Sequence, residues 1–379
     1  VSDVADQLEG KSTLIYAGRG TLGCATELAE LARTLGAPVI TSTSARGVVA
    51  EDHDLSLVID MMPLGVVNEI IGSFDIVLAL GIGLGENSTR GFKLEIRPDQ
   101  LLHVDSSPPG STPDYEAHLR IVADAPTVVL ALLARQIRCK PTRPESIDLW
   151  RARLTHHSIE EIEPVIDGFG HPSAFFSALR ESLPRNAMLF CDSGSHQMLA
   201  RKYYRSYCAS GLQLPTNLQS MGFALPSAIG ASLARPGTPI VVLIGDGGFQ
   251  MSGLELLSAN RYRTNMVVFV MCDGYLGLIR EKQITYDGYE YGVGLPDLDI
   301  SGFCRSLSLD HVADAASLLN GNREWWNPGG PTVVTVRARD SQRMAGRIRV
   351  NRLKKQIKDK LGPRRLAKIR KLGGSIGLK

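Results

Sequence analysis

Asp246 and Asp273 are the residues of this sequence whose surroundings most clearly indicate chemistry. Each follows an apolar run typical of a buried strand, residues 239–244 and residues 266–271. Two parallel strands joined by one helix form a right-handed unit in which both carboxyl ends lie at one edge of the sheet. We therefore expect the two carboxylates, 27 positions apart in sequence, to lie close together. Their mutual repulsion would be relieved by a hard divalent cation such as Mg²⁺, which prefers oxygen ligands.

The residues around Asp246 are suited to a phosphate group. The first of these strands ends in Gly245-Asp246-Gly247-Gly248, and a helix is expected to follow, with Leu254, Leu257 and Tyr262 at helical spacing. Glycines at the start of a helix leave backbone N–H groups exposed, and such groups bind phosphate oxygens. The stretch 239–280 therefore predicts an Mg²⁺ site beside a diphosphate site.

The same stretch resembles the thiamine-diphosphate enzymes. Their motif is GDG with an Asn 26 positions after the second Gly; here GDG occupies 245–247 and Asp273 stands at the Asn position. GDGGFQMSGLEL is similar to the acetolactate synthase and 2-oxoacid decarboxylase branch, and GYLGLIR is similar to glyoxylate carboligase. The resemblance covers about residues 10–340 and implies thiamine diphosphate and Mg²⁺ as cofactors.

Length and composition limit the class of protein. With 379 residues the chain can form two domains of ordinary size, and 44% hydrophobic with 21% charged residues is usual for a globular protein. No apolar run approaches the ~18 residues of a membrane helix, and the N-terminus has no secretory signal. The six cysteines include no CxxC pair, which argues against zinc and favours reduced thiols. We therefore expect a cytoplasmic protein.

Strands alternate with helical stretches, which predicts an α/β fold of two domains, each a parallel sheet flanked by helices. Residues 1–136 form the first, which resembles the central Rossmann-like domain of the family, and the polar residues 137–150 read as a linker. Residues 151–340 resemble the pyrophosphate-binding domain, and residues 341–379 form a basic tail. The strands expected in the first domain are 12–17, 37–41, 75–81, 101–105 and 120–123, with a helix at 25–35. Expected in the second are helices at 148–163, 173–183 and about 300–307, an Ala-rich helix ending near 233, and strands at 188–191 and 331–336.

A literal GxGxxG stands at 18–23, between an expected strand and an expected helix. A dinucleotide fingerprint also requires an acid about 20 residues on, and the second strand ends in ITSTSARG without one, which favours a tight turn over NAD binding. Acetolactate synthases hold FAD in the domain that residues 1–136 resemble. Here GIGLGENSTR at 81–90 replaces the family's GARFDDR-like segment, so we expect a structural domain rather than an FAD site.

The resemblance extends to further residues of the cofactor site. His196 alone could be a core, a surface or a ligand-contacting histidine, but GSHQM matches the family's GQHQM, whose His and Gln lie near the diphosphate. QSMGFALPSAIGA aligns with GTMGFGLPAAIGA, which implies that Met221 supports the bent cofactor and that the carbonyl of Gln219 accepts a bond from its amino group. The residues expected to contact the cofactor are thus Ser195, His196, Gln197, Gly245, Gly247, Gly248 and Met251, with Met221 and Gln219 setting its shape.

The resemblance also implies a metal and a substrate set. Asp246 and Asp273 would hold Mg²⁺, with the main-chain oxygen of Tyr275 as a third ligand. Asp in place of Asn at 273 adds a negative charge, which should tighten Mg²⁺ binding and oppose the diphosphate. Three residues after the metal loop could face substrate, namely Leu276, Ile279 and Arg280. Arg280 could pair with a carboxylate, or it could be a surface arginine.

Full-length members of the family also have a pyrimidine-binding domain that supplies a catalytic glutamate, and no segment of this sequence resembles it. We expect the larger subunit of a split, acetolactate synthase-like enzyme, with that domain on a separate subunit in an α2β2 assembly, unless the sequence is a fragment. Such an enzyme would decarboxylate a small-molecule 2-oxoacid and either release an aldehyde or ligate the enamine to a second carbonyl. The alternatives are a non-catalytic scaffold or regulatory subunit that retains the fold, and an NAD-dependent dehydrogenase.

The net charge of +3 hides an asymmetry. Residues 341–379 carry 14 Lys or Arg and one acid, whereas the remainder carries 28 basic and 38 acidic residues. Apolar residues are interleaved with the basic ones, as in an amphipathic helix broken at Gly362-Pro363. The tail could be solvated, could dock on an acidic partner surface, or could bind an anionic membrane or nucleic acid. The acidic body favours docking within a complex, and we do not expect nucleic acid as a partner.

Overall fold

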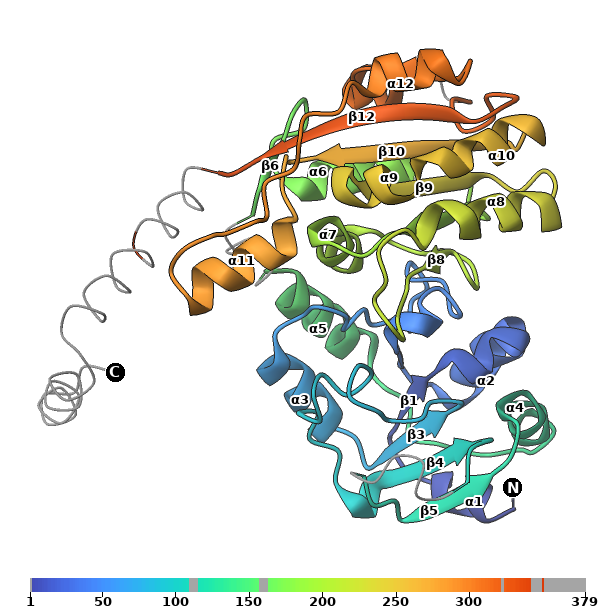
Figure 1. Cartoon of the computed structure of the whole chain (residues 1–379). Coiled ribbons are helices and arrows are strands. Elements are labelled where there is room, and N and C mark those ends of the chain that lie inside the picture. The colour runs from blue at the N-terminus through green and yellow to red at the C-terminus, as the bar shows by residue number, and fades with distance from the viewer. Residues whose placement is uncertain (1, 109–114, 157–162, 322–323, 342–349, 351–379) are drawn as a thin grey trace, which may run out of the picture.

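The computed structural model describes residues 2–108, 115–156, 163–321, 324–341 and 350. Two parallel sheets, each covered by helices on both faces, form two lobes that are stacked one above the other (Figure 1). This confirms the predicted α/β architecture. The basic tail beyond residue 341 and the end of the helix expected at 148–163 lie outside the described residues, apart from Val350. Within the described residues, no helix is both long enough and apolar enough to cross a bilayer.

The first lobe has five parallel strands in the order β2-β1-β3-β4-β5. Helices α1, α2 and α4 pack on one face of this sheet, and α3 and α5 pack on the other. The strands are β1 (Thr13–Ala17), β2 (Val39–Thr41), β3 (Ile76–Leu80), β4 (Leu101–Asp105) and β5 (Leu119–Val122). The helices are α1 (Ser2–Leu8), α2 (Ala25–Leu35), α3 (Leu64–Gly72), α4 (Ala125–Leu133) and α5 (Pro144–His156). These bounds confirm the expected strands and the expected helix at 25–35 to within two residues.

The second lobe has six parallel strands in the order β11-β12-β10-β9-β7-β8, and β6 pairs antiparallel with β12. The strands are β6 (Val165–Ile166), β7 (Met188–Cys191), β8 (Leu212–Gln213), β9 (Ile240–Gly245), β10 (Met266–Cys272), β11 (Asp310–Val312) and β12 (Thr332–Arg339). One face carries α6 (Pro172–Glu181), α7 (Ser195–Tyr203) and α13 (Ala315–Asn320). The other carries α8 (Ala224–Ala234), α9 (Asp246–Ser252), α10 (Leu256–Arg261) and α12 (Ile300–Ser306), while α11 (Gly277–Tyr286) lies to one side (Figure 1).

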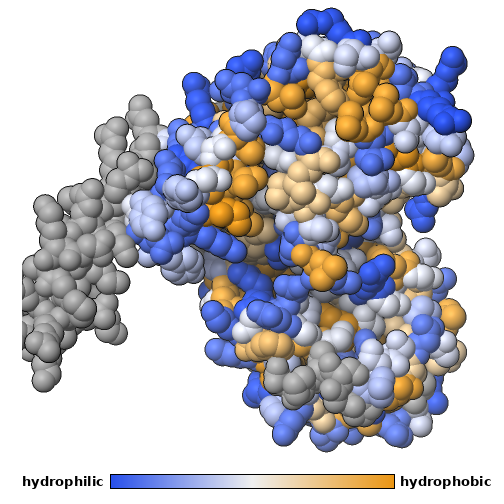
Figure 2. All heavy atoms as spheres, viewed as in Figure 1, coloured by the Kyte–Doolittle hydropathy of each residue, from blue (hydrophilic) through white to orange (hydrophobic). Residues whose placement is uncertain are grey.

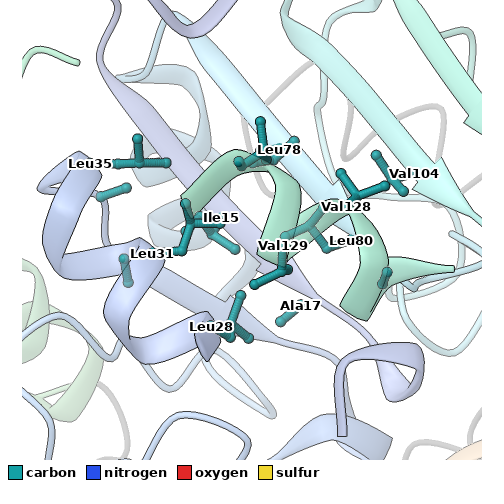
Figure 3. Packing of buried hydrophobic residues seen from close by; sticks show 14 of the residues in the cluster. Ile15, Ala17, Leu28, Leu31, Leu35, Leu78, Leu80, Val104, Val128 and Val129 are labelled. Carbon is teal, nitrogen blue, oxygen red and sulfur yellow. The ribbon is translucent and has the colours of Figure 1, made fainter. Parts of the chain in front are cut away.

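Both sheets consist of nearly continuous apolar runs because helices cover both faces. In the first lobe, Leu28, Leu31 and Leu35 of α2 follow one another at helical spacing and are buried against Ile15 and Leu78 of the sheet (Figure 3). Burying a leucine side chain of this kind contributes roughly 1.5–3 kcal/mol. The apolar residues that predict these strands and helices from the sequence are therefore the ones that pack against each other in the fold.

The helix expected after residue 245 differs from the prediction in two ways. It is broken into α9, a short 3-10 turn at Gly253–Glu255, and α10. Its apolar residues at helical spacing do not face the core, since Leu254, Leu257 and Tyr262 are 67%, 54% and 58% exposed. Phe249 and Leu256 are buried against the sheet instead. The periodicity of Leu254, Leu257 and Tyr262 therefore marks an outward apolar surface of the second lobe.

Helix α5 was expected to open the second domain, but it packs on the first sheet. Ile147 and Leu154 belong to the same buried cluster as Leu14 of β1, and the ring of Trp150 lies 5.5 Å from that of Phe74. The composition of the polar stretch before α5 cannot show to which sheet the next helix returns.

A buried ion pair joins the two lobes. Arg46 of the first lobe contacts both carboxylate oxygens of Glu51, at 2.6 and 2.7 Å, and its side chain has no exposed surface. The same guanidinium donates to the backbone carbonyls of Arg201 and Tyr204 at the end of α7, and Glu51 accepts from the backbone N–H of Ser206. The arginine is thus satisfied by partners on both lobes, and it fixes α7 against the first lobe.

Removing Glu51 should destabilise the chain strongly. Glu51→Leu leaves the Arg46 guanidinium buried without its counter-ion, and breaking such a pair from one side costs about 3–5 kcal/mol. Glu69→Leu is the matched control because the Arg153–Glu69 pair is largely exposed, and such pairs contribute less than about 1 kcal/mol. The measurement is urea unfolding of both variants, and equal, small losses would contradict a structural role for the buried pair.

Candidate functional site

The predicted meeting of Asp246 and Asp273 is present in the structure. Strands β9 and β10 pair in parallel, with Gly245 opposite Met271, so both aspartates follow at the same edge of the sheet. The carboxylate of Asp246 accepts from the backbone N–H groups of Gly247 at 2.9 Å and Gly274 at 2.8 Å. The second of these bonds ties the turn after β9 directly to the turn after β10.

The two carboxylates lie in surroundings that disfavour their charged forms. Burial raises the pKa of Asp246, and burial followed by the neighbouring charge of Asp246 raises the pKa of Asp273 to about 6, against the N–H of Tyr275 that lowers it. A bound cation would relieve this penalty. Within the described ranges no group of three or more His, Cys, Asp or Glu could hold a metal, so further ligands would have to be carbonyls, phosphate or water. Mg²⁺ accepts that mixture, and the donor set therefore fits it.

These aspartates open into a cavity of about 420 Å³, hereafter the site cavity. It lies at the carboxyl ends of β7, β9 and β10, where the strand order of the second sheet reverses, which is where ligands bind in open α/β sheets. Its lining includes most of the residues expected at the cofactor, metal and substrate: Ser195, His196, Met221, Gly245, Asp246, Gly247, Gly248, Asp273, Tyr275, Leu276, Ile279 and Arg280.

The glycines of the Gly245–Gly248 turn are required by close contacts. A Cβ on Gly247 would lie 2.9 Å from Leu276 and 3.3 Å from the end of the Met221 side chain. The N–H of Gly247 was expected to be free for phosphate, but it donates to the carboxylate of Asp246. The turn therefore supports the carboxylate of Asp246 as well as the wall of the cavity.

His196 enters the site cavity from the first turn of α7. The chain reaches it through Gly194, whose φ of 154° suits glycine and where a Cβ would lie 2.6 Å from the His196 ring. Burial lowers the pKa of His196 to about 4, so the imidazole is neutral at pH 7. Its Nε2 atom is buried and has no hydrogen-bond partner among the residues that the structure describes. An unpaired buried nitrogen beside the aspartates fits a polar ligand group in the cavity.

Gln197 and Gln219 were expected at the same site, but they line a second space. This interlobe hollow of about 330 Å³ lies between the two sheets and is bordered by Ser42, Ser44 and Arg201. Gln197 is 1% exposed, and its carboxamide has no hydrogen-bond partner within the described part of the chain. Successive residues of one helical turn point to different sides, so His196 and Gln197 reach different spaces despite their adjacency.

Met251 and Arg280 were also expected to contact the cofactor or the substrate, but their surroundings in the structure do not favour that role. Met251 is 67% exposed on the outer side of α9. Arg280 contacts Glu290 at 2.6 Å and Asp340 at 3.0 Å, and its guanidinium lies 4.0 Å from the centre of the Tyr275 ring. Its charge is compensated within the chain, which favours a role in holding α11 beside the cavity over pairing with a substrate carboxylate.

Some lining residues were not singled out from the sequence. Lys202 and Glu163 form a buried pair at 2.8 Å on the wall of the site cavity, and Met61 reaches it from the first lobe. No spacing in the sequence connects these three. Asp192 is a further residue of interest. It directly follows a buried strand, as Asp246 and Asp273 do, and the same signal could have identified it.

The GxGxxG turn of the first lobe packs tightly against the end of the neighbouring strand β3. The N–H groups of Gly18 and Gly20 donate to the carbonyls of Leu80 and Gly81, at 2.8 and 2.9 Å. A Cβ on Gly18 would lie 2.2 Å from the Gly81 carbonyl oxygen. These glycines allow two strand ends to touch, and their N–H groups are already bonded. The N–H groups of Gly18 and Gly20 are therefore not free to bind the diphosphate of NAD, which agrees with a tight turn at this motif.

Both lobes match the profiles of known protein domains. Residues 1–132 match the family profile described as thiamine pyrophosphate enzyme, central domain, and residues 192–336 match thiamine pyrophosphate enzyme, C-terminal TPP binding domain.

Among curated proteins, the chain is 28% identical over 299 residues to the probable acetolactate synthase large subunit of Methanocaldococcus jannaschii, covering 74% of this chain and 49% of that protein. It is 29% identical over 307 residues to the acetolactate synthase isozyme 3 large subunit of Escherichia coli, covering 76% of this chain and 52% of that protein. It is 30% identical over 295 residues to the acetolactate synthase large subunit IlvB1 of Mycobacterium tuberculosis, covering 74% and 46%. The chain spans about half the length of the curated relatives it matches.

The raised pKa of Asp273 has a consequence for stability. A carboxyl whose pKa is higher in the folded chain stabilises the fold at low pH, and that contribution is lost as the pH rises through about 6. Asp273→Asn removes the ionised form and keeps an oxygen for the Tyr275 N–H. The metal-free variant should therefore be more stable than the unchanged chain at pH 7, by about 1–3 kcal/mol, with the gain vanishing near pH 4. Urea unfolding at both pH values measures this, and a pH-independent difference would contradict it.

Proposed function

The chain belongs to the thiamine pyrophosphate enzyme family, and from this we propose that it forms the Mg²⁺–thiamine diphosphate-binding part of an acetolactate synthase-like enzyme acting on a 2-oxoacid. The observation that carries the proposal is the pair Asp246 and Asp273 at the ends of adjacent strands, in a cavity that His196 and Met221 also line. The acetolactate synthase relatives support the branch of the family.

In this proposal each group has a physical task. Asp246 and Asp273 hold Mg²⁺ with the main-chain oxygen of Tyr275, and the cation offsets the burial that raises both carboxyl pKa values. Ser195 and the Gly245–Gly248 turn, which line the site cavity with these aspartates, would hold a diphosphate whose charge a bound Mg²⁺ would offset. Neutral His196 contacts the diphosphate through the nitrogen that otherwise has no partner within the described chain.

The remaining walls position the organic part of the cofactor. Met221 lies against Gly247 and places an apolar side chain beside the metal site, where it supports the bend of the cofactor. Thiamine diphosphate, once bound, supplies a nucleophilic carbon and an electron sink for the loss of CO₂ from a 2-oxoacid. Leu276 and Ile279, which follow Tyr275 in the sequence, add apolar side chains to the wall of the cavity.

We also propose that a pyrimidine-binding domain on a partner polypeptide covers the outward apolar surface of the second lobe. Met251, Leu254, Leu257 and Tyr262 are each more than half exposed on the segment that begins at Asp246. Figure 2 shows apolar side chains at the surface of the upper lobe. Apolar groups gathered on one surface usually mark a contact with another protein. A domain seated there would contact the segment that begins at Asp246, and it could contribute the glutamate that activates the cofactor.

Cofactor binding should depend on Asp246 and tolerate replacement of Asp273. Asp246→Ala removes a metal ligand and the link to Gly274, and we expect it to abolish detectable binding of thiamine diphosphate in the presence of Mg²⁺. Asp273→Asn restores the residue usual in the family and keeps an oxygen ligand, so binding should persist within about tenfold. Calorimetric titration measures both. Undiminished binding by Asp246→Ala would overturn the metal assignment.

The outward apolar surface should be needed for catalysis and dispensable for cofactor binding. The chain is purified alone and with the product of any adjacent gene that resembles a pyrimidine-binding domain, and CO₂ release is measured from pyruvate, glyoxylate and aryl or branched 2-oxoacids. Leu254→Asp should weaken assembly and CO₂ release at least tenfold while leaving the affinity for thiamine diphosphate unchanged.

Leu149→Asp is the matched control, because Leu149 is 59% exposed on α5 of the first lobe, and it should have no effect on assembly. Equal effects of the two substitutions would contradict the proposed surface. Absence of CO₂ release from every combination, despite bound cofactor, would favour a non-catalytic scaffold.

A further inference from the structure

Asp192 is a fully buried carboxylate directly before Ser193, which lines the site cavity. It follows β7, and its backbone N–H still pairs with the carbonyl of Leu243 in β9, so the side chain is held at the edge of the sheet. Its relative exposure is 0%. Burial raises its pKa, while the backbone N–H groups of Gly222, Ala224, Phe223 and Ser193 lower it. Burying a carboxylate costs free energy because the charge loses its hydration. The groups that Asp192 contacts therefore show which part of the structure this buried charge stabilises.

The contacts of Asp192 are to the turn that carries Met221. One carboxylate oxygen, Oδ1, accepts from the N–H groups of Phe223 at 2.8 Å and Ala224 at 3.2 Å. The other, Oδ2, accepts from the N–H of Gly222 at 2.9 Å. Hydrogen bonds to an ionised acceptor are roughly twice as strong as neutral ones, and these three satisfy the first N–H groups at the start of α8. The carboxylate thus replaces an N-cap that the helix does not have within its own sequence.

The turn held by Asp192 has an uncommon backbone. Gln219 has a φ of 52° and Gly222 a φ of 79°, so the residues on both sides of Met221 include left-handed conformations. A left-handed non-glycine residue is sustained only when surrounding contacts determine it. Asp192 accepts from the N–H groups that begin at the residue directly after Met221, and so fixes this end of the turn, while the N–H of Gln219 donates to the carbonyl of Pro215.

Asp192 also touches the turn that carries the metal-binding Asp246. A Cβ on Gly248 would lie 2.3 Å from Oδ2 of Asp192 and 3.0 Å from Ile244. The carboxylate therefore rests against the backbone of α9 on one side and bonds the Met221 turn on the other. It sets the distance between the element that would hold the diphosphate and the side chain that would support the thiazolium ring.

We propose that Asp192 is a positioning residue that fixes Met221 relative to the Gly245–Gly248 turn, so that the site selects the bent form of thiamine diphosphate over the diphosphate alone. This inference rests on the proposed function. It separates two parts of cofactor recognition: Asp246 and Asp273 serve the diphosphate and metal, and Asp192 serves the ring through Met221.

The test compares two ligands on the complete chain. Inorganic pyrophosphate with Mg²⁺ needs only the metal and diphosphate part, whereas thiamine diphosphate with Mg²⁺ also needs Met221. In Asp192→Asn the amide oxygen can keep the bonds from Phe223 and Ala224, but the amide NH₂ then faces the N–H of Gly222 and the turn is released. We expect the affinity for thiamine diphosphate to fall about tenfold and the affinity for pyrophosphate to change less than threefold, as measured by calorimetry.

A double-mutant cycle distinguishes positioning from general destabilisation. Because Asp192 acts through Met221, Asp192→Asn should weaken thiamine diphosphate binding much less when Met221→Ala is already present. In the enzyme reconstituted with its partner, kcat at saturating cofactor should fall about tenfold with the substrate KM changed less than threefold. Additive effects in the cycle, or equal losses for pyrophosphate and thiamine diphosphate, would overturn the proposal.

Two further variants keep the test decisive. Gly222→Ala strains the same turn at a left-handed residue, and its nearest contact, Ser252, lies an ordinary 3.6 Å away. It should reproduce the selective loss even if Asp192→Asn does not fold, and an equal loss for both ligands would count against the proposal. Asp314→Asn is the control and should leave both affinities unchanged. Asp314 caps α13 by accepting from two backbone N–H groups, and it does not line the site cavity. If the unchanged chain binds neither ligand, the proposed function itself fails.

Discussion

Three neighbouring parallel strands of the second sheet, β7, β9 and β10, each end in an aspartate, and the site depends on how these three charges are compensated. Asp192 is satisfied by the backbone of the Met221 turn, and Asp246 by the N–H groups of Gly247 and Gly274. Asp273 receives one N–H, from Tyr275, and its pKa is raised to about 6. Negative charge therefore accumulates on the β10 side of the edge, which is where a cation is needed.

The first lobe contributes rigidity to this arrangement. Arg46 bonds the carbonyls at the end of α7, and Arg201 of α7 pairs with Asp60 at 2.7 Å. Because α7 is held at its carboxyl end, its first turn presents His196 to the site cavity and Gln197 to the interlobe hollow in a fixed way. The closed glycine turn at 18–23 belongs to the same structural role, since it joins strand ends inside the first lobe.

Two surfaces of the second lobe differ in whether their side chains have partners within the chain. Arg280 pairs with Glu290 and Asp340, so α11 is tied to the end of β12 and forms a wall of the cavity. The segment from Met251 to Tyr262, which follows the Gly245–Gly248 turn, exposes apolar side chains that the chain's own core does not use. An apolar surface of this kind is suited to contact with another protein.

The sequence alone determined the strand and helix alternation and the meeting of Asp246 and Asp273, because apolar periodicity and the handedness of the parallel βαβ unit are local properties. It also indicated His196 and Met221 through their motifs. Tertiary structure decided what depends on direction and on distant partners. It sent Gln197 to a separate hollow, paired Arg280 internally, turned Leu254 and Leu257 outward, and placed Asp192 under a turn 30 residues later. The facing of a side chain and the partner of a buried charge are set by packing between elements far apart in the chain, and no spacing along the sequence encodes them.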